Sequence, residues 1–194
     1  MCEGGIGCVL MAAGAASRFG ADKLAVELGG RSLLRRACEA VPAWRLNRVC
    51  IVTARPEGIE LARKFGFLHV LNDRPELGAS LTVRLGLRAL PGCRAALFMT
   101  ADQPLLRRET VERLLDAWLE QPDRIAALAH CGGRGNPCIF PAAYFPELLA
   151  LEGDRGGSAV IKRHPEALLL VEADARELMD VDSRGDLGRL MGIH

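Results

Sequence analysis

Apolar runs alternate with amphipathic stretches along the whole chain. The first run, 6–13 (IGCVLMAA), contains only apolar or small residues, which is typical of a strand buried inside a sheet. Further runs predict strands at 48–53, 67–71, 95–100, 125–129, 137–140 and 167–171. Between them, apolar residues recur at helical spacing and predict helices at 32–41, 57–65, 80–90, 109–119, 157–163 and 183–191. Ser183 has the residue type and position of an N-cap for the last of these helices.

This alternation of strands and helices predicts the class of fold. Strand–helix–strand units build an α/β domain in which a mostly parallel sheet is covered by helices on both faces. Open sheets of this kind bind ligands beyond the carboxyl ends of the strands, so the residues that follow each strand are the first candidates for a site. The chain has 194 residues and shows neither an internal repeat nor a dividing linker, so we expect a single domain over 1–194.

Composition and charge exclude several classes of protein. Lys and Arg number 25 against 24 Asp and Glu, so the overall field is too weak to favour a nucleic-acid partner, and an anionic ligand needs local cations or a metal. The longest apolar runs fall far short of the ~20 residues that span a bilayer, and we expect no membrane segment. The seven cysteines are odd in number and form no Cys-x-x-Cys pair, which favours reduced thiols in a cytoplasmic protein.

The loop after the first strand has the composition of a phosphate-binding loop. Residues 12–23 (AAGAASRFGADK) combine small residues, whose backbone N–H groups can approach an anion closely, with the cations Arg18 and Lys23. The spacing of Gly14 and Gly20 fits neither the Walker A loop nor the dinucleotide-binding fingerprint. From these residues alone, a plain turn with two solvated cations is the alternative.

The same loop resembles the signature loop of the MobA-like nucleotidyltransferases, which is roughly Leu-Ala-Ala/Gly-Gly-x-x-x-Arg-Met/Phe-Gly-x-x-Lys. The resemblance implies a Rossmann-like fold of three α/β/α layers and a loop that wraps the phosphates of a nucleoside triphosphate. Nucleotide binding is thereby assigned to Ala12, Ala13, Gly14, Arg18, Gly20 and Lys23. Arg18 and Lys23 are in addition the implied catalytic cations. Met11 stands where the family more often has Leu.

Two aspartates are candidate metal ligands. Asp102 follows a predicted strand in 95–106 (AALFMTADQPLL), where a carboxylate is well placed to hold Mg²⁺. The segment resembles the family's metal-binding segment, which makes Asp102 the first-ranked ligand and a catalytic residue. Further along, 179–187 (MDVDSRGDL) resembles a family motif in which Asp180 or Asp182 completes the metal site, with Asp182 favoured. The alternatives are that Asp102 and Asp182 only cap the helices that follow them.

A segment before the third predicted helix resembles the molybdenum cofactor cytidylyltransferase branch of the family. In 72–81 (NDRPELGASL) the resemblance places Asn72, Gly78 and Ser80 beside the base and ribose of the nucleotide. Gly78 and Ser80 also suit a plain helix start, which stays open at this point.

Two later segments resemble the same branch and imply contacts with the acceptor. In 132–140 (GGRGNPCIF), Asn136 stands where the branch usually has His. In 151–157 (LEGDRGG), the match to a Gly-Asp-x-Gly turn implies that Asp154 and Arg155 contact the second substrate. The alternative for 151–157 is a plain turn that uses Gly153 and Gly156 and has no role in binding.

Together, these matches imply an enzyme that uses Mg²⁺ to transfer a nucleoside monophosphate from a nucleoside triphosphate to a phosphorylated acceptor, with release of pyrophosphate. The branch favours CTP over GTP and the molybdopterin form of the molybdenum cofactor as acceptor, with a molybdenum hydroxylase as the recipient of the product. Two alternatives stay open. The acceptor is a sugar phosphate or methylerythritol phosphate, or the chain is a non-catalytic carrier or insertion chaperone for the cofactor.

The remaining reactive residues predict no second chemistry. Among His69, His130, His164 and His194, no pair has the spacing of zinc ligands, and packed or solvated side chains are the default for such histidines. The sequence contains no Gly-x-Ser-x-Gly motif and no Cys-His pattern typical of a nucleophilic hydrolase.

Overall fold

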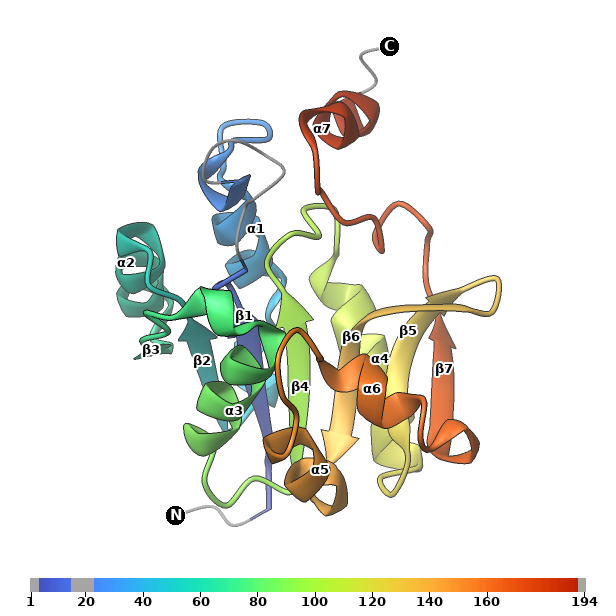
Figure 1. Ribbon diagram of the computed structural model, residues 1–194. Helices are drawn as coiled ribbons and strands as arrows, with labels where there is room; N and C mark the ends of the chain where they lie inside the picture. Colours follow the sequence, from blue (N-terminus) through green and yellow to red (C-terminus); the bar gives the residue numbers. More distant parts are fainter. Residues whose placement is uncertain (1–3, 15–22, 192–194) are drawn as a thin grey trace.

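A seven-stranded sheet runs through the chain in the order β3-β2-β1-β4-β6-β5-β7 (Figure 1). The computed structural model describes residues 4–14 and 23–191, so the predicted phosphate-loop residues Arg18 and Gly20 lie outside the described residues. The strands are β1 Ile6–Met11, β2 Arg48–Val52, β3 Leu68–Val70, β4 Ala95–Thr100, β5 Ile125–His130, β6 Gly133–Pro141 and β7 Leu168–Glu172.

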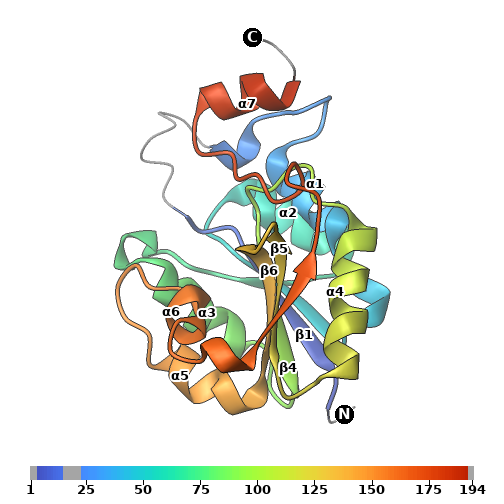
Figure 2. The ribbon, with the colours of Figure 1, turned by 90° about the vertical axis from the view of Figure 1, so that its right-hand side faces the viewer.

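Helices cover both faces of the sheet and give three layers (Figure 2). The α-helices are α1 Leu33–Ala40, α2 Pro56–Phe65, α3 Ala79–Arg88, α4 Arg108–Glu120, α5 Phe145–Leu149, α6 Gly157–Ile161 and α7 Arg184–Met191. Short 3₁₀ turns lie at Lys23–Ala25, Ala43–Arg45, Pro75–Leu77, Ala142–Tyr144 and Pro165–Ala167. Helices α1, α2 and α4 pack on one face, and α3, α5 and α6 pack on the other.

The two hydrophobic cores follow from the alternation of side chains along each strand. On β1, Cys8 and Leu10 pack into the core beneath α1 and α4, whereas Val9 packs into the core beneath α3. A strand covered on both faces must be apolar at every position, which is why the run that begins at Ile6 is continuous rather than alternating. The helices, in contrast, bury only one stripe, as Trp118 of α4 illustrates.

The directions of the strands bring several strand ends to one edge of the sheet. β1 pairs in parallel with β2 and β4, and β5 pairs in parallel with β7. β6 is antiparallel to both of its neighbours, β4 and β5, so β4 and β5 point the same way. The carboxyl ends of β1, β4, β5 and β7 therefore share one edge. The prediction of a mostly parallel α/β sheet is confirmed.

The elements differ from the predicted ones mainly at their ends. β6 begins at Gly133, four residues before the apolar run that predicted it, because backbone pairing with β5 does not need apolar side chains. The short helix α5 was not predicted. Ser183 does cap α7: its Oγ accepts from the backbone N–H of Asp186 at 3.3 Å, and the Asp186 carboxylate accepts from the N–H of Ser183 at 2.7 Å. None of the helices in the described ranges is both long and apolar enough to cross a membrane.

Candidate active site

A cavity of about 510 Å³ opens where β1 and β4 end. Its volume lies in the range of small-molecule sites, and its position is the one at which open α/β sheets bind ligands. It is lined by Met11, Ala13, Gly14, Lys23, Leu24, Pro75, Glu76, Leu77, Gly78, Ala79, Thr82, Thr100, Ala101, Asp102, Gly153 and Asp154. Residues from the start, the middle and the later part of the chain thus meet at one place.

Lys23 joins two carboxylates at the rim of this cavity. Its Nζ lies 2.9 Å from Asp102 Oδ2 and 3.0 Å from Asp182 Oδ1. Partial burial acts to lower the pKa of Lys23, but the charges and hydrogen bonds of Asp102 and Asp182 outweigh it, so the pKa lies above its ordinary value. The ammonium group is therefore a permanent cation near neutral pH.

Backbone contacts bring Asp102 and Asp182 together at Lys23. Asp102 lies two residues beyond the end of β4, and its carbonyl accepts from the N–H of Val181 at 2.9 Å, which docks the segment 173–182 beside the end of β4. The same segment is anchored by Glu177, a buried carboxylate that accepts from the backbone N–H of Arg107 at 3.0 Å. In this arrangement Asp182 is carried to Lys23 from a distant part of the chain.

The alternative of simple helix capping does not hold for either aspartate. The N-cap of α4 is Arg107, five residues beyond Asp102, and the N-cap residue of α7 is Ser183 rather than Asp182. Both carboxylates instead face the ammonium of Lys23. Neither side chain is therefore explained by the local needs of a helix.

Asp180 adds a third carboxylate to the group. Loss of water around its carboxyl and the charges of Asp102 and Asp182 raise the pKa of Asp180 to about 6, although Gln103 and Lys23 act in the opposite direction. Sequence comparison with the family had favoured Asp182 over Asp180. The structure brings both to the site, because they lie on either side of Val181, whose backbone is tied to Asp102.

These residues fit a hard divalent cation. Asp102 and Asp182 contact the single lysine and Asp180 lies close enough to feel their charges, so the described side chains carry an excess of negative charge. Asp102 Oδ1 and Thr100 Oγ1 are buried, and neither finds a hydrogen-bond partner among the described residues. A buried carboxylate oxygen without a partner is costly unless a cation or water meets it, and oxygen ligands of this kind suit Mg²⁺.

The first part of the predicted phosphate loop is held by an arginine that the sequence did not single out. Arg55, just before α2, donates to the carbonyl of Ala12 and, at 3.0 Å, to that of Gly14. Ala12 is fully buried, whereas Ala13 and Gly14 line the cavity. Because Arg55 occupies the carbonyl groups of Ala12 and Gly14, it helps to fix the direction in which the chain leaves β1.

The opposite wall of the cavity is a contact between two glycine turns. Gly78 has φ +86° and stands at the N-cap of α3, and a Cβ there would lie 2.4 Å from the carbonyl oxygen of Gly153. The N–H of Ser80 donates to that carbonyl at 3.2 Å, and Asp154 Oδ1 accepts from the N–H of Ala79 at 3.2 Å. The turn 153–156 thereby caps α3 from outside, a use of Asp154 that motif matching had not foreseen.

Other predicted site residues lie farther from the cavity. Asn72 is 1% exposed, and its amide donates to Thr82 Oγ1 at 3.0 Å and accepts from the N–H of Arg74 at 3.2 Å. Both ends of the Asn72 amide are thus used within the protein, where they hold a turn, and the side chain is not open to a ligand. Ser80 is fully buried and its Oγ has no partner among the described residues.

A second cavity, of about 610 Å³, lies beside the first and shares Asp154 with it. Its lining includes the exposed cations Arg155 and Lys162, so the predicted acceptor residues Asp154 and Arg155 are both on cavity walls. Asn136, the third predicted acceptor residue, is half-buried in β6 and lines neither of these two cavities.

The proximity of the Asp102, Asp180 and Asp182 carboxylates is expected to lower the stability of the fold. At pH values well above 6 and without divalent cations, we expect Asp180→Asn to raise the free energy of unfolding by roughly 1 kcal/mol, because it removes a repulsive charge that solvent only partly screens. Thermal melts in the presence of a chelator test this, with Asp123→Asn, on an exposed loop, as the matched control. An Asp180 variant no more stable than the control variant would contradict the described crowding.

The comparison with protein families decides the identity of the domain. Residues 8–168 match the model of the MobA-like NTP transferase domain. The chain belongs to this family. As a MobA-like nucleotidyltransferase, it is 28% identical over 190 residues to the purine catabolism protein PucB of Bacillus subtilis, an alignment that covers 90% of each chain. It is also 29% identical over 170 residues to the molybdenum cofactor guanylyltransferase of Rhizobium meliloti, which covers 82% of this chain and 75% of the relative.

Solved structures agree on the fold of this MobA-like domain. A nucleotidyl transferase from Methanothermobacter superimposes with a TM-score of 0.80 at 23% identity, over 95% of both chains. The Rossmann-like three-layer fold expected from the loop resemblance is confirmed.

Proposed function

We propose that this MobA-like domain transfers a nucleoside monophosphate from a nucleoside triphosphate to a molybdopterin-type acceptor and releases pyrophosphate. One observation carries the proposal: the ammonium of Lys23 lies between Asp102 and Asp182 at the mouth of a cavity where β1 and β4 end. In a nucleotidyltransferase fold, this is the place where a triphosphate and a divalent cation can be held together.

The triphosphate end of the nucleotide is assigned to the rim of the cavity near Lys23. Gly14 leaves backbone exposed there, and Lys23 supplies a charge-assisted donor for phosphate oxygens. Arg18 and Gly20 belong to the same proposed loop by sequence. On nucleotide binding, Lys23 exchanges part of its contact with Asp102 and Asp182 for contact with the phosphates.

The carboxylate group is assigned to the metal. Asp102 and Asp182 would hold Mg²⁺, with Asp180 beside them. When bound, Mg²⁺ would supply positive charge that offsets the negative charge of the phosphates. The excess of negative charge at this rim is otherwise unfavourable for a triphosphate, which supports a role for the cation in substrate binding.

The reaction itself needs positioning rather than a protein nucleophile. A phosphate oxygen of the acceptor attacks the α-phosphorus, a new P–O bond forms, and the bond to the bridging oxygen of the β-phosphate breaks in line with it. Lys23 lies where it can stabilise the charge that gathers on the departing pyrophosphate, and the loop resemblance assigns the same role to Arg18. Asp102 and Asp182 would hold the cation that neutralises phosphate charge beside Lys23.

The acceptor is assigned to the side of the second cavity. Asp154 lies on the walls of both cavities, and Arg155 brings a cation to the second one, which supports a site for a phosphorylated molecule next to the nucleotide. The relative from Rhizobium meliloti, named a molybdenum cofactor guanylyltransferase, supports a molybdenum cofactor acceptor. The cytidylyltransferase-like segments around Asn136 and Asp154 favour CTP.

A matrix of donors and acceptors tests the proposal. CTP, GTP and ATP are each combined with Mg²⁺ and with molybdopterin, methylerythritol phosphate or a sugar 1-phosphate, and pyrophosphate release is measured. We expect turnover with molybdopterin, at least about 10-fold faster with CTP than with GTP. Faster turnover with GTP would reject the donor assignment, and turnover confined to the other acceptors would reject molybdopterin. Tight binding of the cofactor without any pyrophosphate release would favour a carrier.

A further inference from the structure

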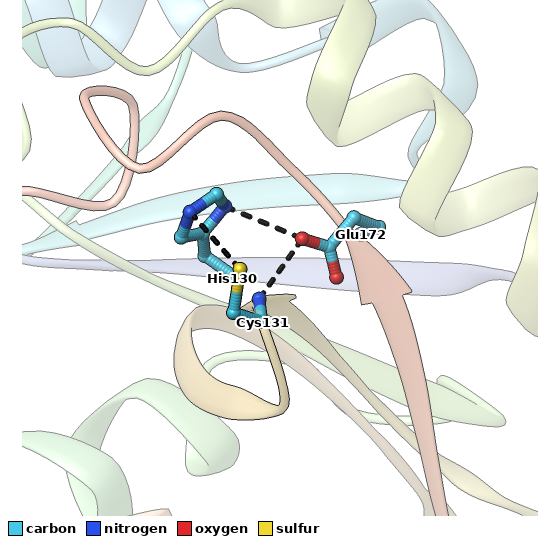
Figure 3. A group of neighbouring side chains, drawn as sticks. All are labelled: His130, Cys131 and Glu172. Atoms are coloured by element: carbon cyan, nitrogen blue, oxygen red, sulfur yellow. Dashed lines mark hydrogen bonds and ion pairs between the residues drawn. The ribbon is translucent and has the colours of Figure 1, made fainter.

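A group of side chains of the types that can bind metals lies at the same edge of the sheet, beyond β6. His130 ends β5, Cys131 begins the turn of the β5–β6 hairpin, and Glu172 ends β7 (Figure 3). One ligand atom from each residue lies within 4.8 Å of the other two, and all three residues are exposed. The group forms because β5 and β7 are parallel neighbours, with Ala129 opposite Glu172.

The hydrogen bonds of His130 leave one ring nitrogen directed at the thiol. Nδ1 lies 3.0 Å from the carbonyl oxygen of Ala173 and 3.3 Å from Glu172 Oε1. Since a carbonyl oxygen only accepts, Nδ1 is the donor, and in the neutral ring this tautomer leaves the lone pair on Nε2. Nε2 lies 3.4 Å from the Sγ of Cys131. A histidine held in this way through its other nitrogen is the usual arrangement behind a metal-ligating imidazole.

The distances suit a tetrahedral ion. Zn–N and Zn–S bonds of about 2.0 and 2.3 Å put two tetrahedral ligand atoms roughly 3.5 Å apart. The distance between Nε2 and Sγ already matches this value. Glu172, whose Oε1 accepts from the N–H of Cys131 at 3.0 Å and lies on the Nδ1 side of the ring, reaches the ion by rotation of its exposed side chain.

The residue type in the turn points the same way. His130 pairs with Gly133, so Cys131 and Gly132 form a two-residue hairpin loop, with φ +48° and +78°. Turns of this kind favour Asn or Asp followed by Gly, because the first position has a positive φ that other side chains rarely adopt. Cysteine at that position goes against the local preference. Such departures are expected where a side chain serves a purpose other than folding.

We propose that His130, Cys131 and Glu172 form a site for one thiophilic divalent cation such as Zn²⁺, with a fourth position left to water. The ligands are nitrogen, thiolate sulfur and carboxylate oxygen, in contrast to the oxygen ligands around Asp102. Binding converts the Cys131 thiol to a thiolate and releases its proton to solvent. The bound ion ties the end of β7 to the hairpin, at the start of the segment that carries Asp182.

Titration with Co²⁺ tests this site directly. Under reducing conditions and with Mg²⁺ in excess, we expect one equivalent of Co²⁺ to give the near-ultraviolet charge-transfer band of a thiolate ligand, which an all-oxygen site cannot give. Cys131→Ser abolishes the band. His130→Ala and Glu172→Gln each weaken Co²⁺ binding by at least about 10-fold. The control variants Cys93→Ser and Cys2→Ser keep the band. Zn²⁺ raises the Tm of the unaltered chain but not that of Cys131→Ser.

Cys131→Asn separates metal binding from folding. Asn suits the turn, so this variant should melt at or above the temperature of the metal-free parent while giving no band. Absence of the band in the unaltered chain, or its persistence in Cys131→Ser, would overturn the proposal. An unchanged Co²⁺ affinity in Glu172→Gln would show that the carboxylate is not a ligand and would overturn the three-ligand site.

Discussion

Replacing Lys23 or Asp102 with alanine is expected to lower turnover by on the order of 100-fold or more. Each change removes charge that acts on the phosphates in the transition state, and contacts of this kind are usually worth at least that factor. Lys23 contacts both Asp102 and Asp182, so its loss also leaves two carboxylates without their ammonium partner. The measurement is pyrophosphate release under saturating nucleotide, acceptor and Mg²⁺.

Matched variants make this first prediction specific. Lys64→Ala removes an exposed lysine from α2, and Asp123→Asn removes an exposed carboxylate from a loop, so both should keep the parent rate. Lys23→Arg keeps the charge and should recover part of the lost rate. Thermal melts exclude unfolding as the cause. Near-parental rates in both alanine variants would defeat the proposed mechanism.

Gly78→Ala is expected to lower the free energy of unfolding by about 3 kcal/mol and to raise the KM for the nucleotide. The new Cβ would lie 2.4 Å from the Gly153 backbone. The alanine itself would have to adopt a φ of +86°. Strain at such a backbone conformation costs about 1–3 kcal/mol, and the clash adds displacement of the turn 153–156 from the cavity wall.

Gly92 provides the control for this second prediction. It has φ +75°, but a Cβ there meets no atom within 4 Å, and it lies in an exposed turn away from the cavity. Gly92→Ala should therefore show the conformational cost alone, about 1 kcal/mol, with an unchanged KM. Denaturant unfolding and steady-state kinetics measure both effects. Equal losses in the two variants would show that the contact between Gly78 and Gly153 is unimportant.

Most elements of the fold were predictable because the central strands are apolar throughout and the longer helices have an apolar stripe. β1 and β4 were located from such runs almost to their ends. β6 was located only in part, since its first residues pair through the backbone and carry no apolar signal. The order of the strands depends on long-range pairing, which no local pattern encodes.

The candidate site was predictable only where a local motif supplied the signal. Asp102 was found because it follows a buried strand, and Lys23 because it ends a small-residue loop. The meeting of Asp182 with Lys23 depends on contacts over 159 positions in the sequence. Arg55 donates hydrogen bonds to backbone carbonyls, and no pattern of residue types predicts such a contact. The group of His130, Cys131 and Glu172 escaped notice for a similar reason, since Glu172 lies 41 positions from Cys131.

A crystal structure with CTP and Mg²⁺, without acceptor, would show where the triphosphate binds. We expect the triphosphate in the cavity at the ends of β1 and β4, with phosphate oxygens at hydrogen-bond distance from Lys23 Nζ and the cation on Asp102. A triphosphate bound elsewhere, or an Asp102 side chain turned away from it, would contradict the proposed site.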